Sequence, residues 1–156
     1  MPSSTQPQTK PKAKDQLEVA QRICASNQAR LTPIRQTAFE LICIAKKPLS
    51  AYELLDQLKT QHHNAQPPTI YRALEFLIEQ RLIHKLSTIN AYYVCDCPGD
   101  PHPVLFLICK ICNQAKEMVE PSLMKQLSQR IKASGYVEQY PLLEVMATCS
   151  TCNEIA

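Results

Sequence analysis

The chain of 156 residues has no long apolar run and no secretory signature. Crossing a bilayer as a helix takes about 18 or more apolar residues, whereas the run at Val104 to Ile108 is only strand-sized. The segment Met1 to Lys14 is polar and lysine-bearing, and it lacks the apolar core of a signal peptide. We therefore expect a cytoplasmic protein without membrane contact, in a compartment that keeps thiols reduced.

The chain also lacks a strong excess of charge, because its formal net charge is only +3. The charges are nevertheless unevenly distributed. Residues 1–95 carry 12 Lys and Arg against 7 Asp and Glu, whereas residues 96–156 carry 5 against 7. This asymmetry suggests that the first part faces nucleic acid, although ordinary solvated surface charge gives the same pattern.

Four of the eight cysteines form two C-x2-C pairs, Cys109 with Cys112 and Cys149 with Cys152. Zinc favours four thiolates in a tetrahedral array, and each pair fits a tight turn that delivers two sulfurs to one side of the metal. A disulfide framework is the alternative, but it requires an oxidising compartment. The spacing predicts one structural zinc site.

The part of the chain before residue 96 is typical of a winged helix domain. Residues 1–15 are too polar to bury apolar area and are expected to form a disordered basic arm. Four helices are predicted: at residues 16–25, after Thr32 as N-cap, after the capping box Ser50-Ala-Tyr-Glu53, and after Pro67-Pro68. The runs 82–86 and 91–94 then predict a two-stranded hairpin, the wing. The core stripe of the fourth helix is expected to be Ile70, Leu74, Leu77 and Ile78.

The sequence from residue 96 onward predicts a small α/β domain. Residues 96–103 contain three prolines and Gly99 and are expected to act as a hinge. Strands are predicted at 104–108, 115–119 and 137–146, with a helix between the last two that begins at Pro121 and ends at Gly135. Leu123, Leu127 and Ile131 share one side of that helix. The fold class is α+β, with a zinc knuckle stapling a domain of roughly 55 residues that cannot build a large core.

The start of the fourth helix carries the residues expected to contact DNA. If this helix packs on the third one, it presents Thr69, Tyr71 and Arg72 outward, which is helix-turn-helix geometry.

A zinc deaminase is excluded, because no histidine is followed two residues later by a glutamate. Cys24 and Cys43 lie in helical patterns and are expected to be inert core thiols. Cys97 is ambiguous, since it could compete with Cys95 for a metal or oxidise with it.

Several motifs together resemble the ferric uptake regulator family over residues 16 to 152. They are Leu31-Thr-Pro-Ile-Arg35, the run Pro68 to Leu77, the His84-Lys pair and the two C-x2-C pairs in this order. Iron and peroxide sensors of that family carry a dense histidine run before the first C-x2-C pair, and residues 103–108 supply no such ligand. The chain is therefore most similar to the zinc-sensing members.

The resemblance implies a second, regulatory zinc bound by His84, Cys95, His102 and Glu117. Two imidazoles, a thiolate and a carboxylate make a plausible tetrahedral zinc set. Because these residues come from the wing, the hinge and the second domain, a metal there would lock the hinge. Each residue alone also has an ordinary explanation, as a solvated side chain, a core thiol or an exposed strand charge. The resemblance further suggests Tyr52 as a DNA contact.

These observations predict a zinc-responsive transcriptional repressor, not an enzyme. It is expected to bind palindromic operator DNA as a homodimer with two zinc ions per chain, with residues 16–95 as the winged-helix domain and 104–156 as the dimerisation domain. Control of zinc uptake genes is implied by the resemblance alone. The alternatives are an iron or peroxide sensor of the same family, a thiol redox switch using Cys95 and Cys97, and a zinc-stapled interaction module without DNA affinity.

Overall fold

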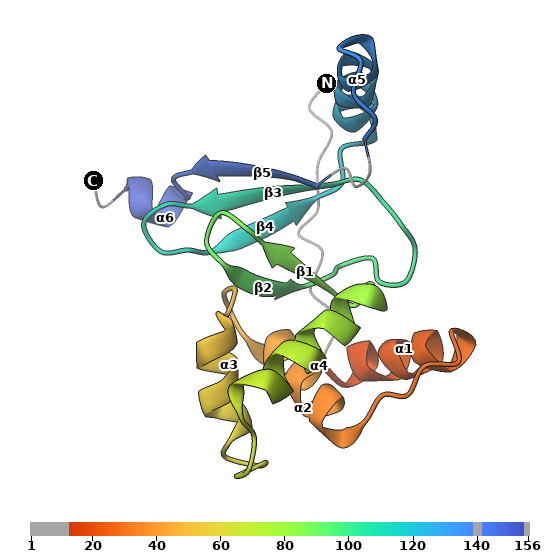
Figure 1. The fold of residues 1–156 in the computed structure, drawn as a ribbon. Coiled ribbons are helices and arrows are strands. Elements are labelled where there is room, and N and C mark those ends of the chain that lie inside the picture. Colours follow the sequence, from red (N-terminus) through yellow and green to blue (C-terminus); the bar gives the residue numbers. More distant parts are fainter. Residues whose placement is uncertain (1–12, 139–141, 155–156) are drawn as a thin grey trace.

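The computed structural model describes residues 13–138 and 142–154. It has an α+β fold in which helices and a hairpin precede a second, three-stranded sheet (Figure 1). The predicted arm, residues 1–15, lies outside the described part except for residues 13–15, which belong to the first helix. No helix in the described part is both long and apolar enough to cross a membrane. The elements are α1 (Ala13–Ser26), α2 (Pro33–Ile44), α3 (Ala51–Leu58), α4 (Pro67–Glu79), β1 (Ile83–Leu86), β2 (Ala91–Val94), β3 (Val104–Cys109), β4 (Ala115–Met118), α5 (Pro121–Ala133), β5 (Leu142–Ala147) and α6 (Ser150–Asn153).

Local sequence signals determine where the first helices begin. The predicted capping box before α3 is present: Glu53 N–H donates to Ser50 Oγ at 3.2 Å, and Ser50 N–H donates to Glu53 Oε2 at 2.8 Å. Thr32 takes the extended N-cap conformation, but its side chain makes no capping hydrogen bond. The helix α2 therefore begins at Pro33 because the proline favours the first helical position rather than because of a side-chain cap.

The core of the helical domain lies between α2, α3 and α4. Leu54 and Leu58 of α3 and Ile70, Leu74 and Leu77 of α4 are almost completely buried. The prediction that Ile78 belongs to this core is wrong, because its side chain is 37% exposed. The buried face of α4 is centred one residue earlier, so that Ala73 and Phe76 occupy the flanks of the stripe.

The predicted wing is an antiparallel hairpin of β1 and β2. Figure 1 shows it lying between the helices and the three-stranded sheet. Leu49, which precedes α3, exchanges two backbone hydrogen bonds with Tyr92 of β2, at 2.8 and 3.1 Å. Because all four residues of β2 are buried, the hairpin is packed on both of its sides and is not a free flap.

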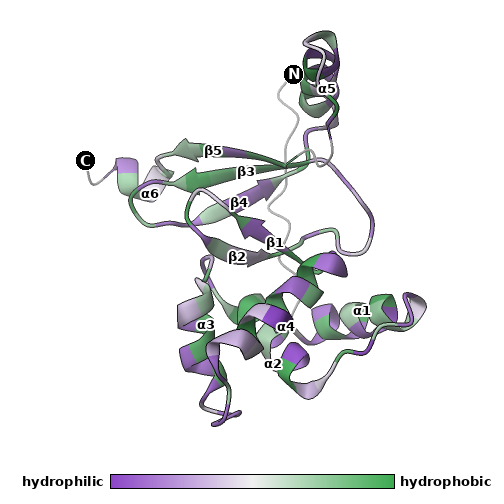
Figure 2. Ribbon diagram, in the orientation of Figure 1, coloured by the Kyte–Doolittle hydropathy of each residue, from purple (hydrophilic) through white to green (hydrophobic). Residues whose placement is uncertain are grey.

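The second sheet has the strand order β4-β3-β5, antiparallel between β3 and β4 and parallel between β3 and β5. The central strand β3 is hydrophobic along its length (Figure 2), and five of its six residues are buried. The last strand was predicted to begin at residue 137, but β5 begins at Leu142 and Val137 is 87% exposed. A proline precedes Leu142 in the sequence, and a proline cannot donate a ladder hydrogen bond.

The helix α5 stands away from the sheet (Figure 1). Its predicted apolar side is therefore not a core in the single chain: Leu123 is 45% exposed, whereas Met124 is buried. The predicted end of this helix is confirmed, because Gly135 adopts a φ of 82° and donates its N–H to the Lys132 carbonyl. This arrangement leaves an apolar helix face and a sheet face without cover in one chain.

The segment 96–103 runs against the helical domain. Gly99 has a φ of 97°, and its N–H donates to the Arg81 carbonyl at 3.2 Å. A Cβ at this position would lie 3.0 Å from Ile23 Cδ1 of α1. The segment predicted as a hinge is therefore anchored to the helical domain at Gly99, and the remaining residues up to Pro103 connect this point to β3.

Candidate metal centres and DNA-binding surface

The first candidate metal centre joins the two C-x2-C pairs at one end of the three-stranded sheet. Cys109 ends β3, Cys112 lies in the following turn, Cys149 precedes α6 and Cys152 lies within it. The turn closes because Asn113 adopts the left-handed conformation with a φ of 57°, as predicted for an asparagine there. The short α6 turns back toward β3, so that the second pair faces the first.

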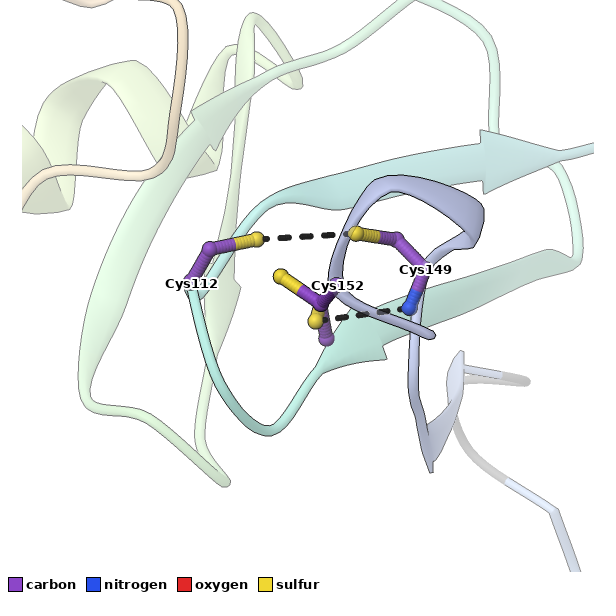
Figure 3. A group of neighbouring side chains, drawn as sticks. Cys112, Cys149 and Cys152 are labelled. Atoms are coloured by element: carbon purple, nitrogen blue, oxygen red, sulfur yellow. Dashed lines mark hydrogen bonds between the residues drawn. The ribbon is translucent and has the colours of Figure 1, made fainter. Parts of the chain in front are cut away.

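The four sulfurs lie close enough together for one metal ion to bind them all. They all lie within 4.8 Å of one another, and Cys112 Sγ and Cys149 Sγ are 3.8 Å apart (Figure 3). A disulfide would bring two sulfurs to about 2.05 Å, whereas zinc–sulfur bonds of about 2.3 Å place tetrahedral sulfurs nearly 3.8 Å apart. The four cysteines therefore fit a closed zinc site.

Backbone amides prepare one of these thiols for ionisation. The N–H groups of Cys112, Cys149 and Ile111 point at Cys109 Sγ and lower the pKa of this thiol to about 6. Hydrogen bonding to Cys149, together with burial, raises the pKa of Cys152 to about 12. Without a cation, four crowded sulfurs cannot all carry negative charge, and this cost is what a divalent metal removes.

The second candidate centre lies between the hairpin and the three-stranded sheet. His84 is on β1, Cys95 follows β2, His102 lies in the connecting segment and Glu117 is on β4. The ligand atoms of these four residues lie within 4.8 Å of one another. Thus the structure brings together the residues that the family resemblance implied, although they come from four separate segments.

His102 is oriented by the backbone of its own loop. Its Nδ1 donates to the Asp100 carbonyl at 2.9 Å, so that Nε2 carries the free lone pair. This nitrogen lies 3.2 Å from Glu117 Oε1 and 3.8 Å from Cys95 Sγ. Two lone pairs that face each other at 3.2 Å require a proton or a metal cation between them. The geometry of His102 and Glu117 therefore fits a metal site.

His84 presents a buried nitrogen with no protein partner. Its Nε2 has no hydrogen bond among the described residues, and the nearest carboxylate oxygen, Glu117 Oε2, is 3.9 Å away. Burial, together with the nearby His102, lowers the pKa of His84 to about 4, so the ring is neutral at pH 7. A neutral imidazole with an unpaired nitrogen in a buried site is what a zinc ligand requires.

Burial also raises the pKa of each of the other two ligand candidates, Cys95 and Glu117. It raises the pKa of Cys95 to about 12, with the Glu117 carboxylate adding to the effect. Burial likewise raises the pKa of Glu117, although the Asp96 N–H donates to its Oε2 at 2.9 Å. The Cys95 thiol would lose its proton when a cation enters, so metal binding at this site is coupled to proton release.

The residues predicted to contact DNA lie near the starts of α3 and α4. Tyr52 is 76% exposed and Tyr71 is 50% exposed. Arg72 is exposed, and its side chain has no hydrogen-bond or ion-pair partner among the described residues. Thr69 is half-buried, and its hydroxyl oxygen accepts from the Gln66 N–H at 3.3 Å, which gives it a capping role as well.

The remaining cysteines lie outside both clusters. Cys24 is buried in α1, as predicted for a core thiol, whereas Cys43 is only partly buried. Cys97 is exposed and is not part of either group of potential ligands.

One carboxylate with a prominent interaction was not predicted from the sequence. Glu144 of β5 accepts hydrogen bonds from the backbone of the hairpin turn, at Ser87 and Thr88. Nothing in the pattern around Glu144 indicates this, because the contact joins segments 56 and 57 residues apart.

The fold and the two groups of potential metal ligands define a winged helix protein whose second, α/β domain carries a four-cysteine site of the kind that binds zinc. The model of the ferric uptake regulator family matches residues 26–146, and the chain belongs to this family. The zinc uptake regulation protein of Escherichia coli (strain K12) is 34% identical over 140 residues, which are 89% of this chain and 82% of that protein.

Solved structures agree with this assignment. A zinc uptake regulator complexed with zinc and DNA matches with a TM-score of 0.87 at 33% identity, covering 94% of this chain and 98% of that one. The holo form of XcZur matches with a TM-score of 0.80 at 40% identity, covering 88% and 96%. The apo form of XcZur, at 39% identity and coverages of 91% and 98%, gives a TM-score of only 0.54. The fold of this chain is therefore closer to the holo form than to the apo form.

Proposed function

We propose that this chain is a zinc-responsive transcriptional repressor, which binds palindromic operator DNA as a zinc-loaded homodimer in the cytoplasm and controls genes for zinc uptake. The observation that carries the proposal is the cluster of His84, Cys95, His102 and Glu117, which spans the boundary between the winged helix domain and the second domain. The similarity to zinc uptake regulators supports zinc as the metal and DNA as the partner.

The two clusters have different roles in this proposal. Cys109, Cys112, Cys149 and Cys152 lie within one domain and would hold a structural zinc that staples the ends of its sheet. His84, Cys95, His102 and Glu117 would hold a regulatory zinc. Zinc, when bound there, supplies one divalent cation that binds side chains from four segments of the chain at the same time.

The structural consequence follows from where the regulatory residues lie. His84 moves with the hairpin, whereas Glu117 moves with the three-stranded sheet. A metal ion bound by both His84 and Glu117 would select one particular arrangement of the two domains. Because an operator requires two recognition helices at a defined half-site spacing, this arrangement determines whether a dimer can bind. The TM-scores for the holo and apo forms of XcZur support a difference in arrangement of this kind.

The uncovered apolar surface of the second domain supports a homodimer. Most of its large exposed hydrophobic residues lie on and beside α5 and β5, namely Val119, Leu123, Tyr136, Val137, Val145 and Met146. A second copy of the chain would cover this surface, as the family's dimers lead one to expect. Dimerisation would place the two helices α4 at a fixed separation.

The first test is a zinc titration of the purified protein with a candidate operator duplex. We expect two zinc ions per chain by elemental analysis, and a chelator should remove the regulatory zinc first while the helical and strand content changes little. Sequence-specific DNA binding should disappear with that first zinc and return on its addition. A single zinc per chain under saturating metal would contradict the two-site proposal, and DNA binding that ignores zinc would contradict the function.

The second test concerns Arg72, which we propose reads a base edge in the major groove. Arg72→Ala should reduce the discrimination between operator and random duplex by about 1 to 3 kcal/mol. The measurement is the ratio of dissociation constants for the two duplexes at a fixed salt concentration, because phosphate contacts depend steeply on salt.

Lys125→Ala is a control of the same charge for Arg72→Ala, since Lys125 is an exposed cation on α5 in the other domain and lies two residues from Leu123, on another side of that helix. The control should leave the discrimination ratio unchanged. If Arg72→Ala weakens both duplexes equally, Arg72 is a phosphate contact and not a reader of sequence. Thr69, Tyr71 and Tyr52 would then be the remaining candidates for base contacts.

A further inference from the structure

One row of side chains crosses the three-stranded sheet toward the hairpin. Phe106 of β3 is the register partner of Glu117 on β4 and of Glu144 on β5. Residues that are directly opposite on neighbouring strands point to the same face of a sheet. Phe106 makes edge contacts with His84 and Tyr93 of the hairpin, with ring centroids 5.3 and 5.9 Å apart. The row therefore faces the hairpin, which lies beside this sheet in Figure 1.

Each end of this row holds a different part of the hairpin. Glu117 lies beside His84 and Cys95 in the regulatory cluster. Glu144 Oε1 accepts from the Ser87 N–H at 2.7 Å, and its Oε2 accepts from the Thr88 N–H at 2.8 Å. Both hydrogen bonds are short and involve a carboxylate, and such charge-assisted pairs are stronger than neutral ones.

The position of Glu144 complements that of the metal cluster. In the order β4-β3-β5 the two glutamates lie on opposite edge strands, and two strand spacings separate them by about 10 Å. An attachment at Glu117 alone fixes only one side of the hairpin turn region to the sheet, and rotation about that point is opposed by apolar packing alone. A second attachment at Glu144 opposes this rotation with two directional hydrogen bonds.

We propose that Glu144 is a positioning residue that fixes the wing turn on β5 and so sets the orientation of the DNA-binding domain. This inference rests on the proposed function. The contact joins the two domains without using a metal, and it exists only when they are closed on each other. The contact therefore raises the fraction of molecules in which the two domains are closed on each other. The zinc affinity of the regulatory site rises by the same factor.

The test compares Glu144→Gln with Glu154→Gln, which removes the same charge from an exposed carboxylate at the end of α6. Zinc alone is titrated into each protein against a competing chelator, after the structural site has been filled. The regulatory site of E144Q should bind zinc about 5-fold to 30-fold more weakly than that of the parent. E154Q should match the parent.

Two further readouts separate positioning from a general loss of stability. Amide hydrogen exchange at Ser87 and Thr88 in the zinc-loaded protein should become faster in E144Q and stay slow in E154Q. With an operator selected from random palindromes, the parent should reject a duplex whose half-sites are moved apart by one base pair. E144Q should reject it less strongly.

The outcomes distinguish this inference from the proposed function. If the parent binds no DNA in the presence of zinc, the proposed function fails, while hydrogen exchange and zinc affinity still decide the role of Glu144. If E144Q exchanges faster but keeps the zinc affinity of the parent, the contact exists without positioning anything, and the inference is wrong. Unchanged exchange in E144Q also overturns it. Should E144Q fold poorly, Glu144→Asp is the second variant, since its shorter side chain cannot reach both amides, and the same expectations apply.

Discussion

Cys109→Ser should unfold the second domain and abolish the dimer. In the described part beyond residue 103, the buried apolar side chains number only six: Val104, Leu105, Phe106, Ile108, Cys109 and Met124. So small a core does not stabilise a domain of about 50 residues without a staple. Structural zinc sites contribute on the order of 10 kcal/mol to folding, which is most or all of the stability that such a domain has.

The loss is measured by circular dichroism and by sedimentation in the presence of zinc. We expect the strand signal and the dimer to disappear together, while the helical domain, whose own elements supply most of the buried apolar residues of the core, keeps its helical signal. Cys97→Ser is the matched control, because Cys97 is exposed and belongs to neither cluster. A Cys109→Ser protein that remained dimeric and held two zinc ions would show that the four cysteines are not a structural site.

His102→Ala should abolish zinc-dependent operator binding while leaving the dimer intact. His102 is only half-buried, it lies in the connecting segment, and it contributes nothing to the hydrophobic core. Its removal deprives the cluster of the imidazole that faces both Cys95 and Glu117. Losing one of four zinc ligands weakens binding by orders of magnitude, so the closed arrangement is no longer selected.

The experiment measures operator binding as a function of zinc concentration, with sedimentation and elemental analysis alongside. The mutant should retain one zinc per chain and the mass of the dimer. His63→Ala is the matched control, since His63 is exposed in the turn between α3 and α4 and lies outside both clusters. If His102→Ala responds to zinc like the parent, the regulatory site lies elsewhere, and Cys97 would be the first residue to test.

These two mutants separate the roles of the two clusters. The cysteine cluster lies within one domain, so its loss acts on folding. The mixed cluster lies between domains, so its loss acts on their arrangement. The thiol redox alternative predicts instead that Cys97→Ser removes regulation. The iron or peroxide alternative predicts that another metal restores DNA binding to the chelated protein, and the zinc regulators among the matched relatives do not favour it.

Much of the fold followed from short-range chemistry. The capping box Ser50 to Glu53, the proline at the start of α2 and the left-handed Asn113 are decided by residues a few positions apart, and the structure confirms each of them. The C-x2-C spacing likewise predicted the local pairing within Cys109–Cys112 and within Cys149–Cys152, whereas the joining of the two pairs is a long-range contact. The errors at Ile78 and the start of β5 arose where neighbouring elements decide which face of a helix is covered or where pairing begins.

The sequence by itself determined the element order, the pairing of the cysteines in two C-x2-C turns and, through the family motifs, the four residues of the second cluster. Only the tertiary structure decided that His84 Nε2 is buried without a partner, that His102 is oriented by the Asp100 carbonyl, and that Glu144 holds the hairpin turn. The physical reason is that a hydrogen bond or a burial cost between distant segments depends on how the domains pack. That packing is a property of the whole chain, and no local pattern encodes it.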